Sequence, residues 1–187
     1  PEWDATGNLD LEDWLPASEA AALSKFQELM PHFETLSKDR EGFGLIHQDA
    51  HGGNFFVQDG QITLFDFDDS VYGWFVYDIA MVLFYAAMWQ EDMAAFTYEF
   101  MGNFLRGYCR ENQLNPTWLK EMPDFLKLRE IDLYAVIHRS MDVENLDDPW
   151  CQGYLRGRKE RIESDVPYIE FEWGMLQEFL GNKSLNT

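Results

Sequence analysis

Three side chains between residues 47 and 68 have the chemistry needed to move a phosphoryl group. Asp49 is a carboxylate that can take a proton from an attacking hydroxyl. Asn54 and Asp66 offer one neutral and one charged oxygen, which suit Mg²⁺, a metal that keeps several waters and binds the phosphates of its nucleotide. Phosphoryl transfer depends mainly on positioning and charge neutralisation. A base and metal ligands held at a fixed separation would meet that need.

A short β-hairpin is expected to set the distance between these groups. Residues 55–57 and 62–65 are runs of aromatic and β-branched side chains that predict two strands. The Asp-Gly pair at 59–60 is among the strongest signals for a tight hairpin turn. Because the two ends of an antiparallel pair meet, Asn54 and Asp66 should become neighbours in space.

The rest of the chain is predicted to be mainly helical. Apolar residues recur at helical spacing, and prolines and glycines interrupt the pattern. The expected helices cover residues 16–38, 74–89, 91–111, 123–141, 149–161 and 168–180. Pro31 is expected to kink or restart the first of them. The predicted fold class is therefore mainly α with a small β-hairpin region (α+β), and residues 1–187 are predicted to form a single domain.

The charge balance and the cysteines limit the partners and the compartment. The chain has 34 acidic and 14 basic residues, a formal net charge of −20, which argues against nucleic acid as a partner. This charge is compatible with a cationic substrate, although an acidic solvated surface produces it equally well. Cys109 and Cys151 lack a metal-type spacing, so a reducing cytoplasm is expected. No membrane partner is expected, because the most apolar run, 74–89, is shorter than the ~20 residues of a membrane span and contains Asp78.

The spacing of the candidate residues matches a known catalytic loop. His47, Asp49 and Asn54 follow the protein-kinase pattern His-x-Asp-x-x-x-x-Asn, and residues 66–68 read Asp-Phe-Asp where protein kinases have Asp-Phe-Gly. A second histidine, His51, and the Asp-Phe-Asp ending set the chain apart from protein kinases. Together with Tyr-Gly at 72–73 and Tyr-Asp-Ile-Ala at 77–80, these motifs resemble the aminoglycoside phosphotransferase and choline kinase-like family. They cover about residues 43–85.

The resemblance implies the C-terminal lobe of a protein-kinase-like fold. It also implies an enzyme that moves the γ-phosphate of ATP, or of GTP, to a hydroxyl of a small molecule. Asp49 would be the catalytic base that orients this hydroxyl. Asn54 and Asp66 would hold Mg²⁺ on the nucleotide, and Asp68 would assist the metal or line the site.

Two further residues would have structural roles in such a site. His47 and Asp78 would bond the backbone of the catalytic loop and hold its shape. Gly52 stands where the family usually has proline, which is a small departure from the pattern.

The family also has an N-terminal lobe, with a phosphate-covering loop and a lysine that pairs the nucleotide phosphates. No glycine-rich loop precedes His47, and the first lysine, Lys25, lies in a predicted helix. Residues 1–16 are therefore expected to be a linker from an N-terminal lobe missing from this chain, and the first residue, Pro1, is compatible with this. The full-length protein would be the enzyme, and this chain alone is expected to be inactive or very weak.

Two other functions stay open at this point. His47, Asp49 and His51 alternate, so on a strand they would share one face and could bind Zn²⁺ or Fe²⁺, with Asp66 completing a metal-dependent hydrolase site. That alternative leaves the Gly-Gly-Asn sequence that ends at Asn54 unexplained. The other alternative is a non-catalytic binding module that kept a kinase-like fold, against which the intact Asp49, Asn54 and Asp66 argue.

Two charged clusters lie outside the candidate stretch. The acidic cluster at 142–148 could contact an amine of the substrate, and a surface turn is the simpler interpretation. The basic cluster at 156–161 is typical of a solvated helix face more than of a phosphate site, because acids lie nearby.

Overall fold

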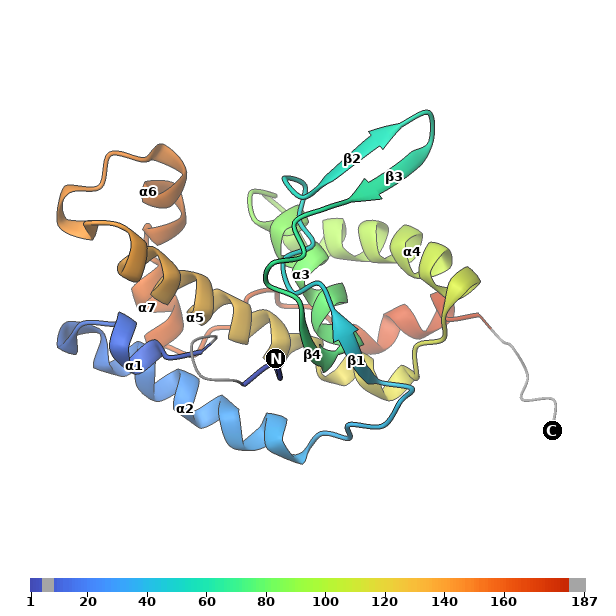
Figure 1. Cartoon of the computed structure of the whole chain (residues 1–187), viewed down its shortest axis with the longest axis horizontal. Coiled ribbons are helices and arrows are strands. Elements are labelled where there is room, and N and C mark those ends of the chain that lie inside the picture. The colour runs from blue at the N-terminus through green and yellow to red at the C-terminus, as the bar shows by residue number, and fades with distance from the viewer. Residues whose placement is uncertain (5–8, 182–187) are drawn as a thin grey trace. The chain divides into compact units, whose positions relative to one another are not determined.

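Two pairs of short antiparallel strands and a hydrophobic helix form the part of the chain that carries residues 47–68 (Figure 1). The computed structural model describes residues 1–4 and 9–181. Contacts divide these residues into two compact units. Unit 1 comprises residues 1–2, 37–126 and 169–181, and unit 2 comprises residues 3–4, 9–36 and 127–168.

The first strand pair leads directly into the candidate site. Strand β1 (Phe43–Ile46) pairs antiparallel with β4 (Val71–Trp74), and Ile46 lies opposite Val71. Ile46 and Val71 lie directly opposite each other, so their buried side chains share one face of the pair, and Trp74 is buried on the other face. The indole Nε1 of Trp74 donates to the backbone oxygen of Ser37 at 2.9 Å. Since β1 ends at Ile46, the loop that follows starts from a fixed point.

The second strand pair is the predicted hairpin. Strand β2 (Phe55–Gln58) pairs with β3 (Gln61–Leu64), and Asp59 and Gly60 form the turn with φ of 51° and 74°. Positive φ at both central positions is the signature of the type I′ turn that Asp-Gly favours. The hairpin is apolar but exposed, with Phe56, Val57 and Ile62 exposing 68%, 63% and 71% of their surface.

Helix α3 (Phe75–Ala87) is the most deeply buried element of unit 1, and α4 (Met93–Glu111) packs against it (Figure 1). Helix α3 follows β4 without a break and is apolar nearly all round, so most of its side chains are buried. Asp92 caps α4, because its carboxylate accepts from the backbone N–H of Ala95 at 2.9 Å. The remaining elements are η2 (Pro116–Lys120), the start of α5 (Met122–Ser140) and η4 (Trp173–Phe179).

Unit 2 is helical and has a buried charge cluster at its centre. Glu130 of α5 has no exposed surface, and it pairs with Arg158 at 2.6 Å and with Lys127 at 3.5 Å. The hydroxyl of Tyr154 donates to the backbone oxygen of Glu130 at 2.7 Å. These partners compensate for the burial of the carboxylate. Its elements besides α5 are α1 (Leu11–Trp14), η1 (Ala17–Glu19), α2 (Ala20–Thr35), η3 (Val143–Asn145), α6 (Pro149–Leu155) and α7 (Arg158–Glu163).

The mainly helical fold with a small β region is confirmed, with four local differences. Helix α2 continues through Pro31 to Thr35 instead of restarting there. Strand β4 was not predicted, since it is short and contains a glycine. The helix expected over 149–161 is divided at Gly157, which has a φ of 67°. The final helix is a 3₁₀-helix, η4.

The predicted linker at 1–16 is only partly described. Its residues 5–8 lie outside the described residues. In the described part, Leu11–Trp14 form α1, and Trp3 and Leu11 are buried. The single-domain assignment and the linker stay predictions. Among the helices of residues 1–4 and 9–181, none combines the length and the apolar composition needed to cross a bilayer.

Candidate active site

The loop that follows β1 is anchored by a carboxylate of α3. The two oxygens of Asp78 accept from the backbone N–H groups of His47 and Gln48, each at 2.8 Å. Gln48 has a φ of 67°, so the chain turns sharply as it leaves the strand. Burial raises the pKa of Asp78, and the two backbone hydrogen bonds act against that shift. The predicted structural role of Asp78 therefore agrees with its contacts.

His47 connects this loop to the segment before Asp66. Its Nδ1 accepts from the backbone N–H of Asp49 at 3.3 Å, and its Nε2 lies 2.9 Å from the backbone oxygen of Phe65. An N–H can only donate and a carbonyl oxygen can only accept, so the proton of the imidazole is on Nε2. The ring is buried and contacts Phe67, with 4.6 Å between the ring centroids. Both nitrogens of His47 are thus engaged with the backbone.

Asp49 and Asn54 contact each other directly in the loop. The side-chain Nδ2 of Asn54 donates to the backbone oxygen of Asp49 at 2.9 Å and to its Oδ2 at 3.0 Å. Both acceptors lack hydrogens, which fixes the orientation of the buried amide. Its Oδ1 therefore faces away from Asp49. An amide oxygen held in this way is a suitable neutral ligand for Mg²⁺.

Asp66 follows the end of the hairpin that carries Asn54. The backbone N–H of Phe65 donates to the backbone oxygen of Asn54 at 3.0 Å, which extends the β2–β3 ladder by one residue pair. Asp66 is exposed and has a φ of 64°, a conformation that short polar residues tolerate best. Asp68 is exposed in the turn that follows. The hairpin thus brings Phe65 opposite Asn54, and Asp66 is the next residue along the chain.

His51 is a hydrogen-bonded histidine of the loop, and the sequence did not indicate which atoms it contacts. Its Nδ1 accepts from the backbone N–H of Gly53 at 2.9 Å, and its Nε2 lies 3.3 Å from Oδ2 of Asp49. Its ring also contacts Tyr85 of α3, with ring centroids 4.7 Å apart. Tyr85 was not a candidate residue, since its place in an apolar run gave no signal of a role at the site.

The metal-hydrolase alternative does not fit this geometry. His47, Asp49 and His51 lie in a loop after β1, so strand alternation does not align them. Both nitrogens of His47 face backbone groups, which leaves it no lone pair for a metal.

The charged clusters of unit 2 are explained by local contacts. Asp142 accepts from the backbone N–H of Glu144 at 3.2 Å and caps η3, and Asp148 accepts from that of Cys151 at 2.7 Å and caps α6. In the basic cluster, Lys159 pairs with Glu19 at 2.8 Å. These contacts agree with the structural interpretations of both clusters.

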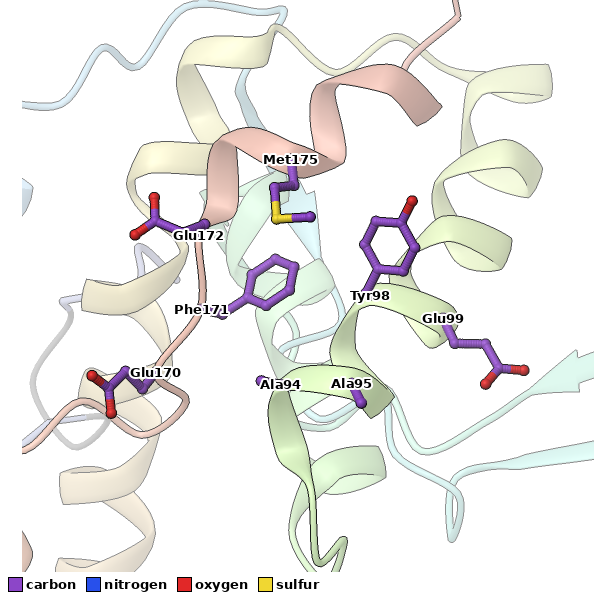
Figure 2. Close-up of a pocket in the computed structure, with 8 residues that line it drawn as sticks. All are labelled: Ala94, Ala95, Tyr98, Glu99, Glu170, Phe171, Glu172 and Met175. Carbon is purple, nitrogen blue, oxygen red and sulfur yellow. The ribbon is translucent and has the colours of Figure 1, made fainter.

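A hollow of about 610 Å³ lies between α4 and the segment that leads into η4 (Figure 2). Figure 2 shows the side chains of Tyr98, Phe171 and Met175 around it. None of the residues described as lining it belongs to the stretch 47–68, so the hollow is separate from the predicted site residues.

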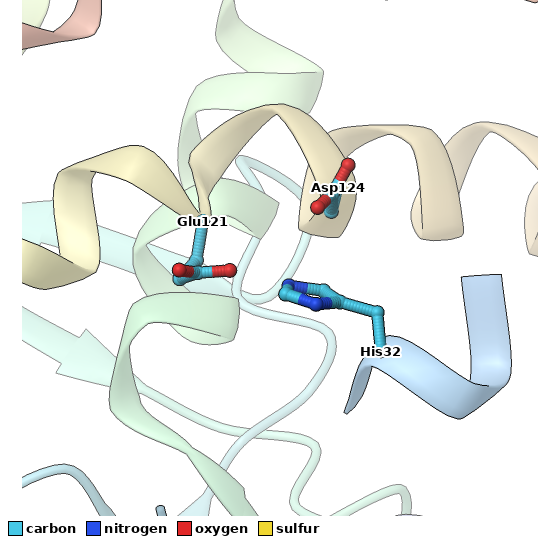
Figure 3. A group of neighbouring side chains, drawn as sticks. All are labelled: His32, Glu121 and Asp124. Carbon is cyan, nitrogen blue, oxygen red and sulfur yellow. The ribbon is translucent and has the colours of Figure 1, made fainter. Parts of the chain in front are cut away.

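Figure 3 shows a group of one histidine and two acids. Glu121 immediately precedes α5, and Asp124 lies in the first turn of that helix; both belong to unit 1. His32 belongs to α2 of unit 2. Because the group draws on both units, we infer no metal site from it.

The arrangement of loop, hairpin and anchoring carboxylate has a counterpart among known families. The model of a family described as the phosphotransferase enzyme family matches residues 1–123, which include every candidate site residue. The chain belongs to this phosphotransferase family. The family resemblance that the motifs indicated is therefore confirmed.

Two relatives of this chain are amicoumacin kinases. The amicoumacin kinase of Bacillus subtilis (strain 168) is 38% identical over 179 residues, which cover 94% of this chain and 53% of that protein. The solved structure of amicoumacin kinase hAmiN in complex with AMP-PNP, Ca²⁺ and Ami matches with a TM-score of 0.87 and 36% identity, covering 94% of this chain and 54% of that one. This phosphotransferase chain thus spans about half the length of these relatives.

A more distant structure supports the fold alone. The microcompartment-associated aminopropanol kinase matches with a TM-score of 0.62 and 23% identity, over 87% of this chain and 52% of that one. Together with the amicoumacin kinase structure, this match confirms the kinase-like fold class of the phosphotransferase chain.

Proposed function

We propose that the protein containing this chain is a kinase that transfers the γ-phosphate of ATP to a hydroxyl of a small molecule. Asp49 is the base that orients and deprotonates the hydroxyl. Asn54 and Asp66 are the oxygen ligands of Mg²⁺ on the nucleotide, and Asp68 assists the metal. GTP is the alternative nucleotide. Bound Mg²⁺ would neutralise charge on the phosphates during transfer.

The pairing of Asp49 with Asn54 is the observation that carries this proposal. The amide that would present an oxygen to the metal is the same amide whose nitrogen bonds the proposed base, at 2.9 and 3.0 Å. Base and metal ligand are therefore held at one separation by a direct contact. Such preorganisation is the main protein contribution to phosphoryl transfer.

The exposed hairpin supports a site completed by the rest of the protein. Phe56, Val57 and Ile62 expose most of their surface next to Asn54 and Asp66. Exposed apolar patches beside a polar site are typical of binding surfaces. We propose that the nucleotide and an N-terminal lobe cover this surface, and that the chain alone is inactive or very weak.

The substrate is proposed to be a small hydroxyl-bearing molecule. The net charge of −20 favours a cationic one, and the amicoumacin kinase relatives make amicoumacin the first molecule to test. The same charge disfavours nucleic acid. The nucleotide requirement and the two reduced cysteines, Cys109 and Cys151, are compatible with the cytoplasm.

The test is a phosphate-transfer assay of the full-length protein with ATP and Mg²⁺, against amicoumacin and a panel of amino alcohols and sugars. Asp49→Asn keeps the size of the side chain and removes the base. We expect kcat to fall about 10²- to 10⁴-fold in this variant, with little change in the KM for ATP. Equal turnover of Asp49→Asn and the unchanged protein would disprove the role of Asp49.

A second measurement separates the kinase from the hydrolase alternative. The kinase is expected to bind Mg²⁺ only together with nucleotide. Zn²⁺ retained by the purified protein through dialysis would contradict it, because tightly held Zn²⁺ is typical of a hydrolase site.

A further inference from the structure

His51 occupies the centre of the loop between the proposed base and the proposed metal ligand. Its Nδ1 accepts the backbone N–H of Gly53 at 2.9 Å, so the proton of the neutral ring is on Nε2. Nε2 lies 3.3 Å from Oδ2 of Asp49. Oδ2 also receives the amide N–H of Asn54 at 3.0 Å. Nitrogens from two positions of the loop therefore lie within 3.3 Å of one carboxylate oxygen.

The ring of His51 packs closely against Tyr85 and Gly53. Tyr85 of α3 contacts it with 4.7 Å between the ring centroids. A Cβ at Gly53 would lie 2.6 Å from Cε1 of His51, much closer than real Cβ contacts come. A Cβ at Gly52 would meet nothing within 4 Å. The imidazole can reach Asp49 because Gly53 has no side chain. A side chain at Gly52 would not obstruct it.

We propose that His51 is a positioning residue for phosphoryl transfer. It fixes the rotation of the Asp49 carboxylate by donating to Oδ2. Because the ring of His51 packs on Tyr85, helix α3 fixes the position of the base indirectly. Proton transfer then needs no reorientation of the carboxylate in each turnover, and misplacement of a catalytic group is costly. This inference rests on the proposed role of Asp49 as base.

The first test is the tautomer of His51, which is read without any substrate. Nitrogen-15 histidine NMR of the full-length protein should show the Nε2–H form for this ring, with Nδ1 as the acceptor. Gly53→Ala should shift the His51 signals strongly, because its Cβ displaces the ring. Gly52→Ala, the matched control, should leave them in place. An Nδ1–H tautomer, or equal effects of the two alanine variants, would overturn the proposal.

The second test is kinetic and uses a graded pair of variants. His51→Ala removes the donor and should lower kcat about 10-fold or more while the KM for ATP stays unchanged. His51→Gln keeps an N–H donor and should recover part of the loss, which a purely structural role of the ring would not predict. Equal kcat for the Ala and Gln variants contradicts the donor role, and an unchanged kcat in both excludes positioning.

Failure of this inference is distinguishable from failure of the proposed function. If Asp49→Asn abolishes transfer and His51→Ala does not lower kcat, only the role of His51 is wrong. If Asp49→Asn retains full activity, the proposed base is wrong and the His51 proposal falls with it. Circular dichroism and the Tm of each variant show whether a loss of activity comes from unfolding.

Discussion

The side-chain amide of Asn54 donates both of its hydrogens to Asp49, one to the backbone oxygen at 2.9 Å and one to Oδ2 at 3.0 Å. Because the amide is buried, the contact stabilises the loop as well as orienting its groups. Stability and the arrangement of the site therefore depend on the same two hydrogen bonds.

Replacing Asn54 should measure that contribution to stability. Asn54→Ala removes both donors and leaves the acceptors of Asp49 less satisfied, so the free energy of unfolding should fall by about 1–3 kcal/mol. Urea unfolding followed by circular dichroism is the measurement. Asn103→Ala is the control, since its exposed amide makes a hydrogen bond to Glu99 within α4, and it should cost less than about 0.5 kcal/mol. Equal losses in both variants would show that the Asp49 contact adds nothing.

Replacing the carboxylate of Asp78 by an amide should weaken the anchoring of the loop. In Asp78→Asn one oxygen becomes an NH₂ group, which would face the N–H of His47 or of Gln48, and we expect a loss of about 1–3 kcal/mol in the free energy of unfolding. Asp92→Asn makes the same chemical change at the cap of α4, where asparagine serves equally well, and should be nearly neutral. A comparison of their Tm values tests this, and a neutral Asp78→Asn would refute the anchor.

A side chain at Gly60 should destabilise the hairpin turn. Its φ of 74° lies in the left-handed region, so Gly60→Ala should destabilise the protein by about 1–2 kcal/mol. Gly107 lies exposed within α4 with open space around its Cα, and Gly107→Ala should instead stabilise by about 0.5–1 kcal/mol. Urea unfolding of both variants gives the two signs, and the same sign in both would contradict the turn type.

The buried acid Glu19 should make part of the stability depend on pH. Burial tends to raise the pKa of Glu19, but hydrogen bonds from Lys159 and Tyr134 outweigh it and hold the pKa below the usual 4.5. An acid with a lowered pKa in the folded state stabilises the protein above its unfolded pKa and loses this contribution as the pH falls through the folded pKa. Glu19→Gln should therefore be less stable by about 1 kcal/mol at neutral pH, and the difference should shrink below about pH 4.5.

The control for this prediction is Glu91→Gln, which changes an exposed glutamate. Its effect should stay within about 0.5 kcal/mol at every pH. Urea unfolding at three pH values measures both variants. A difference for Glu19→Gln that does not change with pH would show that the carboxylate charge is not what the contacts of Lys159 and Tyr134 stabilise.

The elements whose formation depends on residues adjacent in the chain could be predicted from the sequence. The Asp-Gly turn at 59–60 and the apolar runs beside it specify the hairpin locally, so the antiparallel pairing that ends with Asn54 and Phe65 could be predicted from the sequence. Strand β4 could not be found in this way. It pairs with β1, from which residues 47–70 separate it in the sequence, and its four residues with a glycine among them are too few to identify a strand.

The contacts of His51 could not be predicted from the sequence, for a different reason. Which atoms an imidazole bonds depends on the rotation of its ring, and here Tyr85 and the bare Cα of Gly53 restrict that rotation. Spacing indicated the residue types at the site, but only the packing shows which of them touch.

The exposed hairpin also bears on how this chain behaves in solution. A two-stranded ribbon has two open edges, and apolar side chains on both faces make it a template for pairing with other copies. The net charge of −20 keeps copies apart at low ionic strength. Salt shortens the reach of that repulsion, from about 10 Å at 0.1 M to about 3 Å at 1 M. We therefore expect the isolated chain to aggregate more readily as the ionic strength rises.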